Sequence, residues 1–163
     1  MLTIKQTITG SPRQVVTEFR ASMRAGLFQT GEFWHHRIMP GHFEFSAIAR
    51  YDYQPRAVGY CRAKARAKHH QRPLEWSGRL KAQVRQSGRI TATAKSVRVT
   101  MVGPKWLNMY RPEYGQPYKY GELVKTLESE SGQMSQMLDQ FVTRRLNELK
   151  TPDYGPLGNF AGC

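Results

Sequence analysis

Residues 128–149 read ESESGQMSQMLDQFVTRRLNEL, and this stretch has the clearest helical pattern in the chain. Glu128 and Glu130 stand near its start and Lys150 follows its end, which places each charge favourably in the field of the helix dipole. The apolar residues recur every three or four positions, as they do on one face of an α-helix; they are Met134, Met137, Leu138, Phe141, Val142, Leu146 and Leu149. The pattern predicts a helix over 128–149 with one face buried.

A second amphipathic helix is predicted over 12–28. Residues 11–14, Ser-Pro-Arg-Gln, have the form of a capping box, with Pro12 at the first helical position. An apolar stripe follows at spacings of three and four, made of Val15, Val16, Phe19, Met23 and Leu27. Gly26 and Gly31 leave the end of this helix open.

Two stretches alternate apolar and polar residues, which is the pattern of half-buried strands. Residues 2–8 predict one strand, and residues 89–102 predict a β-hairpin that turns at Lys95-Ser96. The fold class that follows is α+β, with a small antiparallel sheet (strand 2–8 plus hairpin 89–102) packed against helices near 12–28 and 128–149. We expect a single domain over 1–151 and an extended C-terminal tail over 152–163.

The middle of the chain has shorter elements. Alanines interleaved with Lys and Arg predict an exposed basic helix over 58–69, because all three residue types favour helix. A further short helix is predicted over 74–86, with Gly88 ending it. Residues 103–121 are rich in Gly, Pro and aromatic side chains and predict a loop, whereas 32–57 has no decisive pattern.

The formal charge of +13 is concentrated in the middle of the chain. Residues 51–105 contain thirteen Lys and Arg side chains but only two acidic ones, Asp52 and Glu75, which is a local excess of +11. Such a field repels itself unless a polyanion or an acidic neighbour offsets it. The charge pattern therefore indicates a binding or assembly protein.

Two kinds of partner fit this basic segment. Its cations can contact the phosphates of a nucleic acid, or they can meet acidic surfaces of other subunits in an assembly. The absence of a zinc-finger or RNA-recognition motif favours assembly. The candidate contact residues are Arg56, Arg62, Lys64, Arg66, Lys68, Arg72, Arg79, Lys81, Arg85 and Arg89.

Catalytic and metal-binding patterns are weak. The chain has no Gly-x-Ser-x-Gly elbow and no Gly-x-x-x-x-Gly-Lys loop, and Cys61 is a single thiol among basic residues. The five histidines are His35, His36, His42, His69 and His70, without the close ligand pairs of structural zinc sites. We expect no enzyme activity, no cofactor and no metal. With neither a leader nor a membrane-spanning run, we also expect a soluble protein made in the cytoplasm.

Two short strings carry a resemblance to a known group of proteins. They are Tyr53-Gln54-Pro55-Arg56, before the basic helix, and Pro73-Leu74-Glu75-Trp76-Ser77-Gly78-Arg79-Leu80, after it. A Pro-Leu-x-x-Ser-Gly-x-Leu turn followed by a hairpin and a closing amphipathic helix resembles the neck and tail-completion proteins of tailed bacteriophages, the head–tail joining family. The resemblance covers about residues 43–149, and the loop 103–121 and the tail 152–163 depart from many relatives.

The resemblance implies a structural protein of the virion with no catalytic residues to carry over. Copies would form a ring at the head–tail junction, between the portal or adaptor and the tail tube, with DNA passing through the channel. In this interpretation Leu74, Ser77, Gly78 and Leu80 mark a turn into the core. The candidates for contacts between subunits are aromatic residues of the loop and the tail: Trp106, Tyr110, Tyr114, Tyr118, Tyr154 and Phe160.

Overall fold

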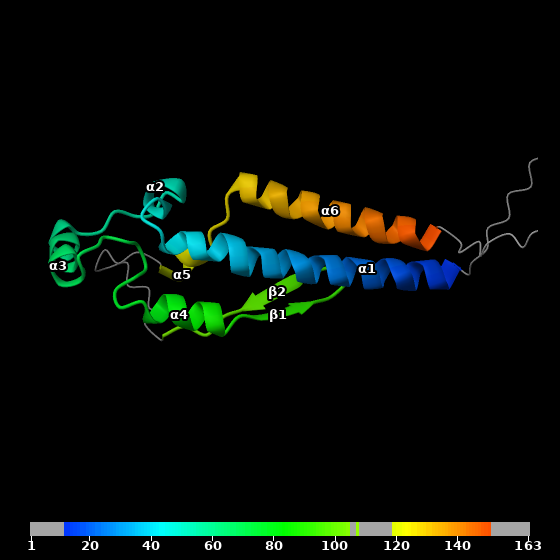
Figure 1. Ribbon diagram of the computed structural model, residues 1–163, viewed down its shortest axis with the longest axis horizontal. Helices are drawn as coiled ribbons and strands as arrows, with labels where there is room; N and C mark the ends of the chain where they lie inside the picture. Colours follow the sequence, from blue (N-terminus) through cyan, green and yellow to red (C-terminus); the bar gives the residue numbers. More distant parts are fainter. Residues whose placement is uncertain (1–11, 105–106, 108–118, 151–163) are drawn as a thin grey trace, which may run out of the picture.

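Two long antiparallel helices, α1 (Pro12–Phe33) and α6 (Glu128–Lys150), lie side by side and give the molecule an elongated shape (Figure 1). The computed structural model describes residues 12–104, 107 and 119–150. We call α1 and α6 together the helical arm. The start of α1 and the end of α6 lie at one end of the molecule, and α3 (Val58–Lys68) lies at the other.

Two glycines that seemed to be possible ends of the first helix are instead points of close contact inside α1. A Cβ atom on Gly26 would lie 2.7 Å from Leu138 Cδ1 of α6. A Cβ atom on Gly31 would lie 2.7 Å from Val97 Cγ2 of the hairpin. The helix continues through both glycines to Phe33. Because these two residues have no Cβ atom, α6 and the hairpin can approach the helix closely.

The hairpin consists of β1 (Arg89–Ala92) and β2 (Val97–Thr100), paired antiparallel with Arg89 opposite Thr100. It packs against α1, while α6 packs along another side of the same helix (Figure 1). The predicted α+β class, the hairpin and both long helices are confirmed. The predicted strand 2–8 and the predicted tail 152–163 lie outside the described residues, so these two elements and the predicted domain boundaries stay predictions.

Beyond α1 the backbone stays helical through a π-helical turn η1 (Trp34–Ile38) and a 3-10 turn η2 (Met39–Phe43). A short helix α2 (Ala47–Arg50) follows, and α5 (Lys119–Val124) packs against η2. These elements surround the apolar core, which contains Met39, Phe43, Ala47, Tyr51, Tyr53, Leu74, Leu80, Val84, Leu107 and Leu123. The core thus lies between the basic helix α3 and the helical arm.

Two boundary predictions were wrong. The helix predicted over 74–86 begins only at Arg79 (α4, Arg79–Gln86), because Leu74 and Gly78 have φ values of 54° and 75°, which a right-handed helix does not allow. The loop predicted over 103–121 includes the first residues of α5. The helix predicted over 58–69 is confirmed, with His69 as its left-handed C-cap.

Candidate basic and aromatic binding surface

Seven of the ten predicted contact residues are exposed: Arg62, Arg66, Lys68, Arg72, Arg79, Arg85 and Arg89. We call the first five of these residues, Arg62 to Arg79, the basic end. They lie on α3, on the segment that follows it and at the start of α4. Helix α3 itself lies at the extremity of the molecule opposite the ends of the helical arm (Figure 1). Much of the predicted basic segment is therefore accessible from solvent at α3 and the segment that joins it to α4.

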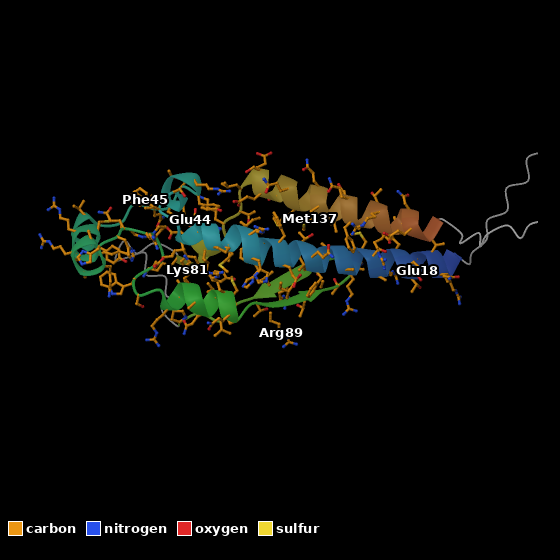
Figure 2. All side chains as sticks on the ribbon, viewed as in Figure 1. Glu18, Glu44, Phe45, Lys81, Arg89 and Met137 are labelled. Atoms are coloured by element: carbon orange, nitrogen blue, oxygen red, sulfur yellow. The ribbon has the colours of Figure 1, made fainter. Side chains whose placement is uncertain are left out.

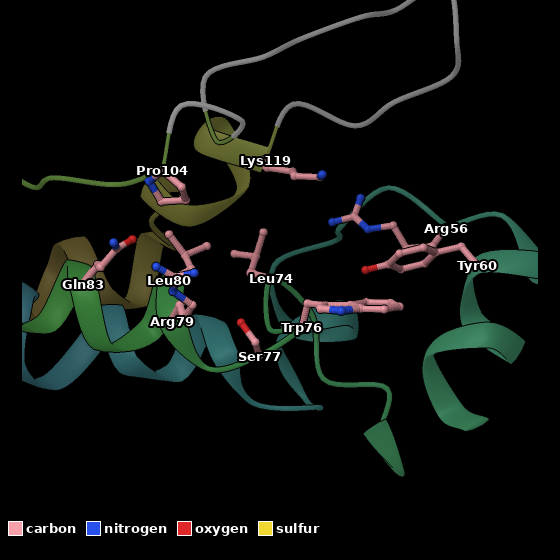
Figure 3. Close-up of a pocket in the computed structure, with 10 residues that line it drawn as sticks. All are labelled: Arg56, Tyr60, Leu74, Trp76, Ser77, Arg79, Leu80, Gln83, Pro104 and Lys119. Atoms are coloured by element: carbon pink, nitrogen blue, oxygen red, sulfur yellow. The ribbon is translucent and has the colours of Figure 1, made fainter. Parts of the chain in front are cut away.

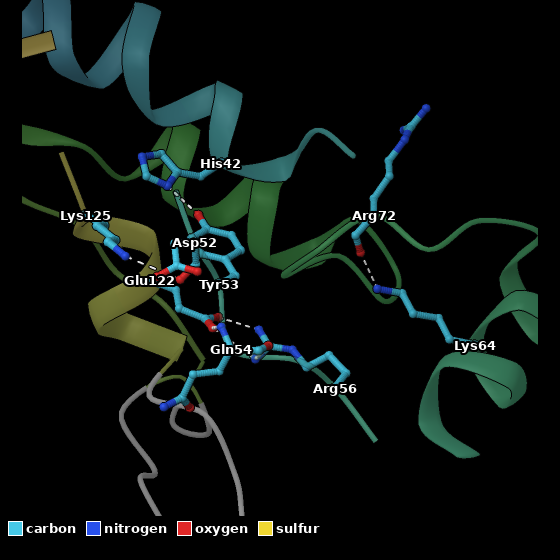
Figure 4. A network of polar contacts seen from close by, with 9 residues as sticks. All are labelled: His42, Asp52, Tyr53, Gln54, Arg56, Lys64, Arg72, Glu122 and Lys125. Carbon is cyan, nitrogen blue, oxygen red and sulfur yellow. Dashed lines mark hydrogen bonds and ion pairs between the residues drawn. The ribbon is translucent and has the colours of Figure 1, made fainter. Parts of the chain in front are cut away.

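The other three predicted contact residues are not exposed. Lys64 is 3% exposed and donates a hydrogen bond from Nζ to the carbonyl oxygen of Arg72 (Figure 4). Burial lowers the pKa of the Lys64 ammonium, and the nearby carboxylate of Glu75 opposes this shift. Lys64 therefore ties α3 to the segment after it. Lys81 is half-buried, so neither of these lysines is as accessible as sequence reasoning expected.

Arg56 is the third, and it is held by an acidic residue on α5. Its guanidinium donates from Nη1 to Glu122 Oε1 at 3.0 Å and from Nη2 to Glu122 Oε2 (Figure 4). The backbone N–H of Gln54 donates to the same Oε1 at 3.2 Å. Glu122 is 8% exposed, so this bidentate pair fixes α5 to the chain that leads into α3.

An aromatic pair beside the basic end was missed by sequence reasoning. The rings of Tyr60 and Trp76 lie 5.7 Å apart between centroids and are tilted by 34°. Lys68 Nζ lies 5.9 Å from the centre of the Trp76 ring, within range of a cation–π contact. Leu74 and Leu80 turn into the core as predicted, but Trp76 from the same turn is on the surface, 43% exposed. The sequence offered one sign of this, since Tyr60 lies in the first turn of the most basic helix and Trp76 follows that helix.

A cavity of about 550 Å³ opens beside the aromatic pair (Figure 3). Its lining combines apolar side chains, including Leu74, with the cationic residues Arg56, Arg79 and Lys119. The predicted subunit contacts Trp106, Tyr110, Tyr114, Tyr118, Tyr154 and Phe160 lie outside the described residues. Cys61 on α3 is half-buried. Within residues 12–104, 107 and 119–150, no three His, Cys, Asp or Glu side chains are grouped so that they could hold a metal ion.

Behind this surface lies a polar network that the sequence did not predict. His42 is fully buried, stacks on Tyr51 with ring centroids 3.9 Å apart, and shares a hydrogen bond of 2.5 Å with the Tyr53 hydroxyl. The Tyr51 hydroxyl donates to Glu130 Oε1 at 2.7 Å. Burial raises the pKa of both tyrosine hydroxyls. The hydrogen bond to Glu130 raises the pKa of Tyr51 further. The network connects η2, the segment after α2 and the first turn of α6.

Acidification from neutral pH to about pH 4 is expected to destabilise the fold through His42. Burial lowers the pKa of His42 from 6.5 to about 4, and the Glu130 carboxylate only partly opposes this. Between these values the unfolded chain binds a proton that the folded chain excludes. The contribution of His42 to the free energy of unfolding is complete above about pH 6.5 and is lost as the pH falls to about 4; it amounts to about 3 kcal/mol.

Urea unfolding at several pH values measures this effect. His42→Phe is expected to be less stable at neutral pH, because Tyr53 loses its partner, but to show a smaller loss of stability on acidification. His36→Gln, at an exposed histidine of the same helical segment, should keep the wild-type pH dependence. An unchanged pH dependence in His42→Phe would contradict the assignment.

Comparisons with family models, with curated proteins and with solved structures found no match to this chain. In the part of the chain that the structure describes, no helix combines the length and the apolar character needed to cross a membrane.

Proposed function

We propose that this chain is a structural subunit of a tailed-bacteriophage virion, and that copies of it associate through the helical arm into a ring at the head–tail junction. The observation that carries the proposal is an apolar face on the first turns of α1 that the other described residues leave exposed. Val15, Val16 and Phe19 are 58%, 48% and 44% exposed, although they begin the apolar stripe that predicts a buried face for this helix. Large apolar side chains grouped in this way are typical of contact surfaces.

The distribution of charge supports a second copy of the chain as the occupant of this face. The helices Pro12–Phe33 and Glu128–Lys150 together contain six basic and six acidic residues, so the arm has no formal net charge. The whole excess of +13 comes from the rest of the chain. Two arms can therefore pack without net repulsion, whereas two basic ends repel each other and favour an anionic partner.

The order of elements also supports the proposal. The turn at Pro73–Leu80, the hairpin 89–100 and the closing helix α6 follow one another in the order on which the resemblance to head–tail joining proteins rests. A ring places all basic ends in equivalent positions, where they can face DNA in the channel or acidic surfaces of portal, adaptor and tail-tube proteins. The protein would be made in the host cytoplasm and become part of the virion.

The second candidate is a stand-alone nucleic-acid-binding protein. The observation that favours it is the basic end itself, with its exposed arginines beside an aromatic pair. This alternative predicts a monomer whose affinity for duplex DNA falls steeply with salt, because phosphate contacts release counterions.

Replacing Phe19 with aspartate is expected to abolish association of the wild-type chain, because the variant places a charge in the apolar contact. Sedimentation velocity and negative-stain imaging of purified protein provide the measurement, and incorporation into particles provides a second one. Phe45→Asp is the matched control, since Phe45 is 66% exposed and lies in the turn before α2, away from the exposed stretch of α1 (Figure 2). A wild-type chain that stays monomeric and is absent from purified virions would refute the proposal.

A further inference from the structure

Helix α3 is exposed over most of its surface. In Figure 1 every other described helix and strand lies on one side of it, toward the helical arm. The helix has 11 residues and is therefore about 16 Å long. All of these residues are described, and Lys64 is the one that is buried. A large partner can therefore reach α3 along its whole length.

Three contacts hold the inner side of α3. Lys64 Nζ donates a hydrogen bond to the carbonyl oxygen of Arg72. The Tyr60 ring lies 5.7 Å from the Trp76 ring between centroids, and Lys68 Nζ lies 5.9 Å from the centre of the same Trp76 ring. All three contacts join α3 to the segment between α3 and α4. The outward side of the helix consequently has a fixed direction before any partner binds.

Arg62 and Arg66 occupy this outward side. They stand two residues before and two residues after Lys64, so 3.6 residues per turn place both within about 20° of the side opposite the buried lysine. Both side chains are exposed. Because they are four residues apart, they are neighbours on one face of the helix and extend in the same direction.

Small residues stand beside the two arginines. Gly59, Ala63 and Ala67 recur every four positions, so they form one row on the surface of α3, and all three are exposed. A Cβ atom added to Gly59 would meet nothing within 4 Å. A partner can therefore approach the backbone of α3 closely along this row, while the arginine side chains extend beyond it.

The outward side of α3 is positively charged without a paired carboxylate in the described part of the chain. Helix α3 contains no Asp or Glu, and among the described residues neither Arg62 nor Arg66 forms an ion pair. The residues outside the description contain three basic side chains and only two acidic ones, Glu113 and Asp153, so they add no net negative charge. This side of the helix therefore favours an anionic partner.

Duplex DNA matches both the charge and the shape of this surface. It has one phosphate charge for about every 1.7 Å of its axis. Its major groove is about 12 Å wide and admits an α-helix, and arginine is the side chain that most often contacts guanine there. The major groove of an RNA duplex is too deep and narrow for side chains to read, and a single strand has no groove.

We propose that α3 binds in the major groove of duplex DNA, with Arg62 and Arg66 directed at the base edges. The other cations of the basic end can add contacts to phosphates beside the groove. This site goes beyond the proposed function, because it assigns the contact with DNA to one helix and needs only one copy of the chain.

Fluorescence anisotropy with labelled duplexes tests the proposal on the full chain. A DNA duplex is expected to bind at least about tenfold more tightly than an RNA duplex of the same sequence and length, since the RNA groove excludes the two arginines. Arg62→Gln and Arg66→Gln should each weaken DNA binding about tenfold, as the loss of one base-edge contact does. Both should leave the weaker binding of RNA nearly unchanged.

Matched variants separate groove binding from a general effect of charge or of surface shape. Arg24→Gln removes an exposed cation from α1 and should bind DNA as the wild type does. Ala63→Phe keeps every charge but adds bulk on the outward side of α3, so it should weaken DNA binding. Ala82→Phe makes the same change at an exposed position of α4 and should not. Circular dichroism checks that each variant is folded.

Methylation by dimethyl sulfate locates the protein on the DNA. Binding should protect guanine N7, which lies in the major groove, and leave adenine N3, which lies in the minor groove, reactive. Protection of adenine N3 alone, equal affinity for DNA and RNA duplexes, or equal losses in Arg62→Gln and Arg24→Gln would each overturn the proposal. Equally good displacement of the duplex by polyglutamate would also overturn it and would identify an acidic protein surface as the partner.

The variant Phe19→Asp distinguishes this site from the proposed function. It disrupts the proposed contact between copies but leaves α3 intact, so it should retain the preference for a DNA duplex over an RNA duplex. The DNA site and the ring can therefore fail separately.

Discussion

Replacing Glu130 with alanine is expected to lower the free energy of unfolding by about 4 kcal/mol, because the carboxylate is 1% exposed and joins three parts of the fold. Its Oε1 accepts hydrogen bonds from the Tyr51 hydroxyl and from Arg50 Nη2, both at 2.7 Å. Its Oε2 accepts the backbone N–H of Leu127 at 3.1 Å, just before the helix begins. Alanine leaves the buried Tyr51 hydroxyl and the helix start without an acceptor.

Chemical denaturation of wild type and variants measures this loss. Glu130→Gln keeps one acceptor oxygen and should lose only about half as much. Glu128→Ala, on the exposed first turn of the same helix, should cost less than about 1 kcal/mol, since only its interaction with the helix dipole is removed. Similar losses for Glu128→Ala and Glu130→Ala would contradict the role assigned to the buried carboxylate.

Replacing Gly88 with alanine is expected to lower the free energy of unfolding by about 3–4 kcal/mol, although it adds only one methyl group. A Cβ atom at this position would lie 2.2 Å from His35 Nε2 and 2.3 Å from His35 Cε1. His35 is 2% exposed, and its Nε2 shares a hydrogen bond of 2.8 Å with the carbonyl oxygen of Val84. The ring must move and give up this bond, or the start of the hairpin must separate from α4.

Thermal and urea unfolding provide the test. Gly59→Ala is the control, because nothing lies within 4 Å of its added Cβ and alanine favours the helix α3, so a gain of about 0.5–1 kcal/mol is expected. Combining Gly88→Ala with His35→Ala should cost less than the sum of the two single losses, since the smaller side chain removes the overlap. Additive losses would show that His35 is not what restricts this position.

The elements with long periodic patterns were predictable from the sequence, and those set by contacts were not. The stripes in 12–28 and 128–149 and the alternation in 89–102 identified α1, α6 and the hairpin. Residues 32–57 had no pattern because η1, η2 and α2 are short and follow the shape of the core. Gly26 and Gly31 were misread as possible helix ends because their role depends on neighbours distant in sequence.

The candidate surface was predicted in its charge but not in its geometry. Exposed residues such as Arg62, Arg66 and Arg79 are accessible as expected. Lys64 and Arg56 have the same charge and lie in the same segment, yet their side chains are engaged within the fold. Lys64 donates to the carbonyl oxygen of Arg72, and Arg56 donates to the carboxylate of Glu122. Tyr60 and Trp76 are sixteen positions apart in sequence, so only the folded chain shows that their rings meet.

The sequence by itself determined the two long helices, the hairpin and the concentration of positive charge between residues 51 and 105, since period and composition are local properties of a chain. The tertiary structure alone decided that Glu130 is buried while Glu128 is exposed, although the sequence predicts the same favourable interaction with the helix dipole for both. It also decided that the apolar stripe of α1 is left exposed at Val15 and Phe19 while it is covered near Gly26. Burial depends on what the rest of the chain brings against a residue, and no local pattern contains that information.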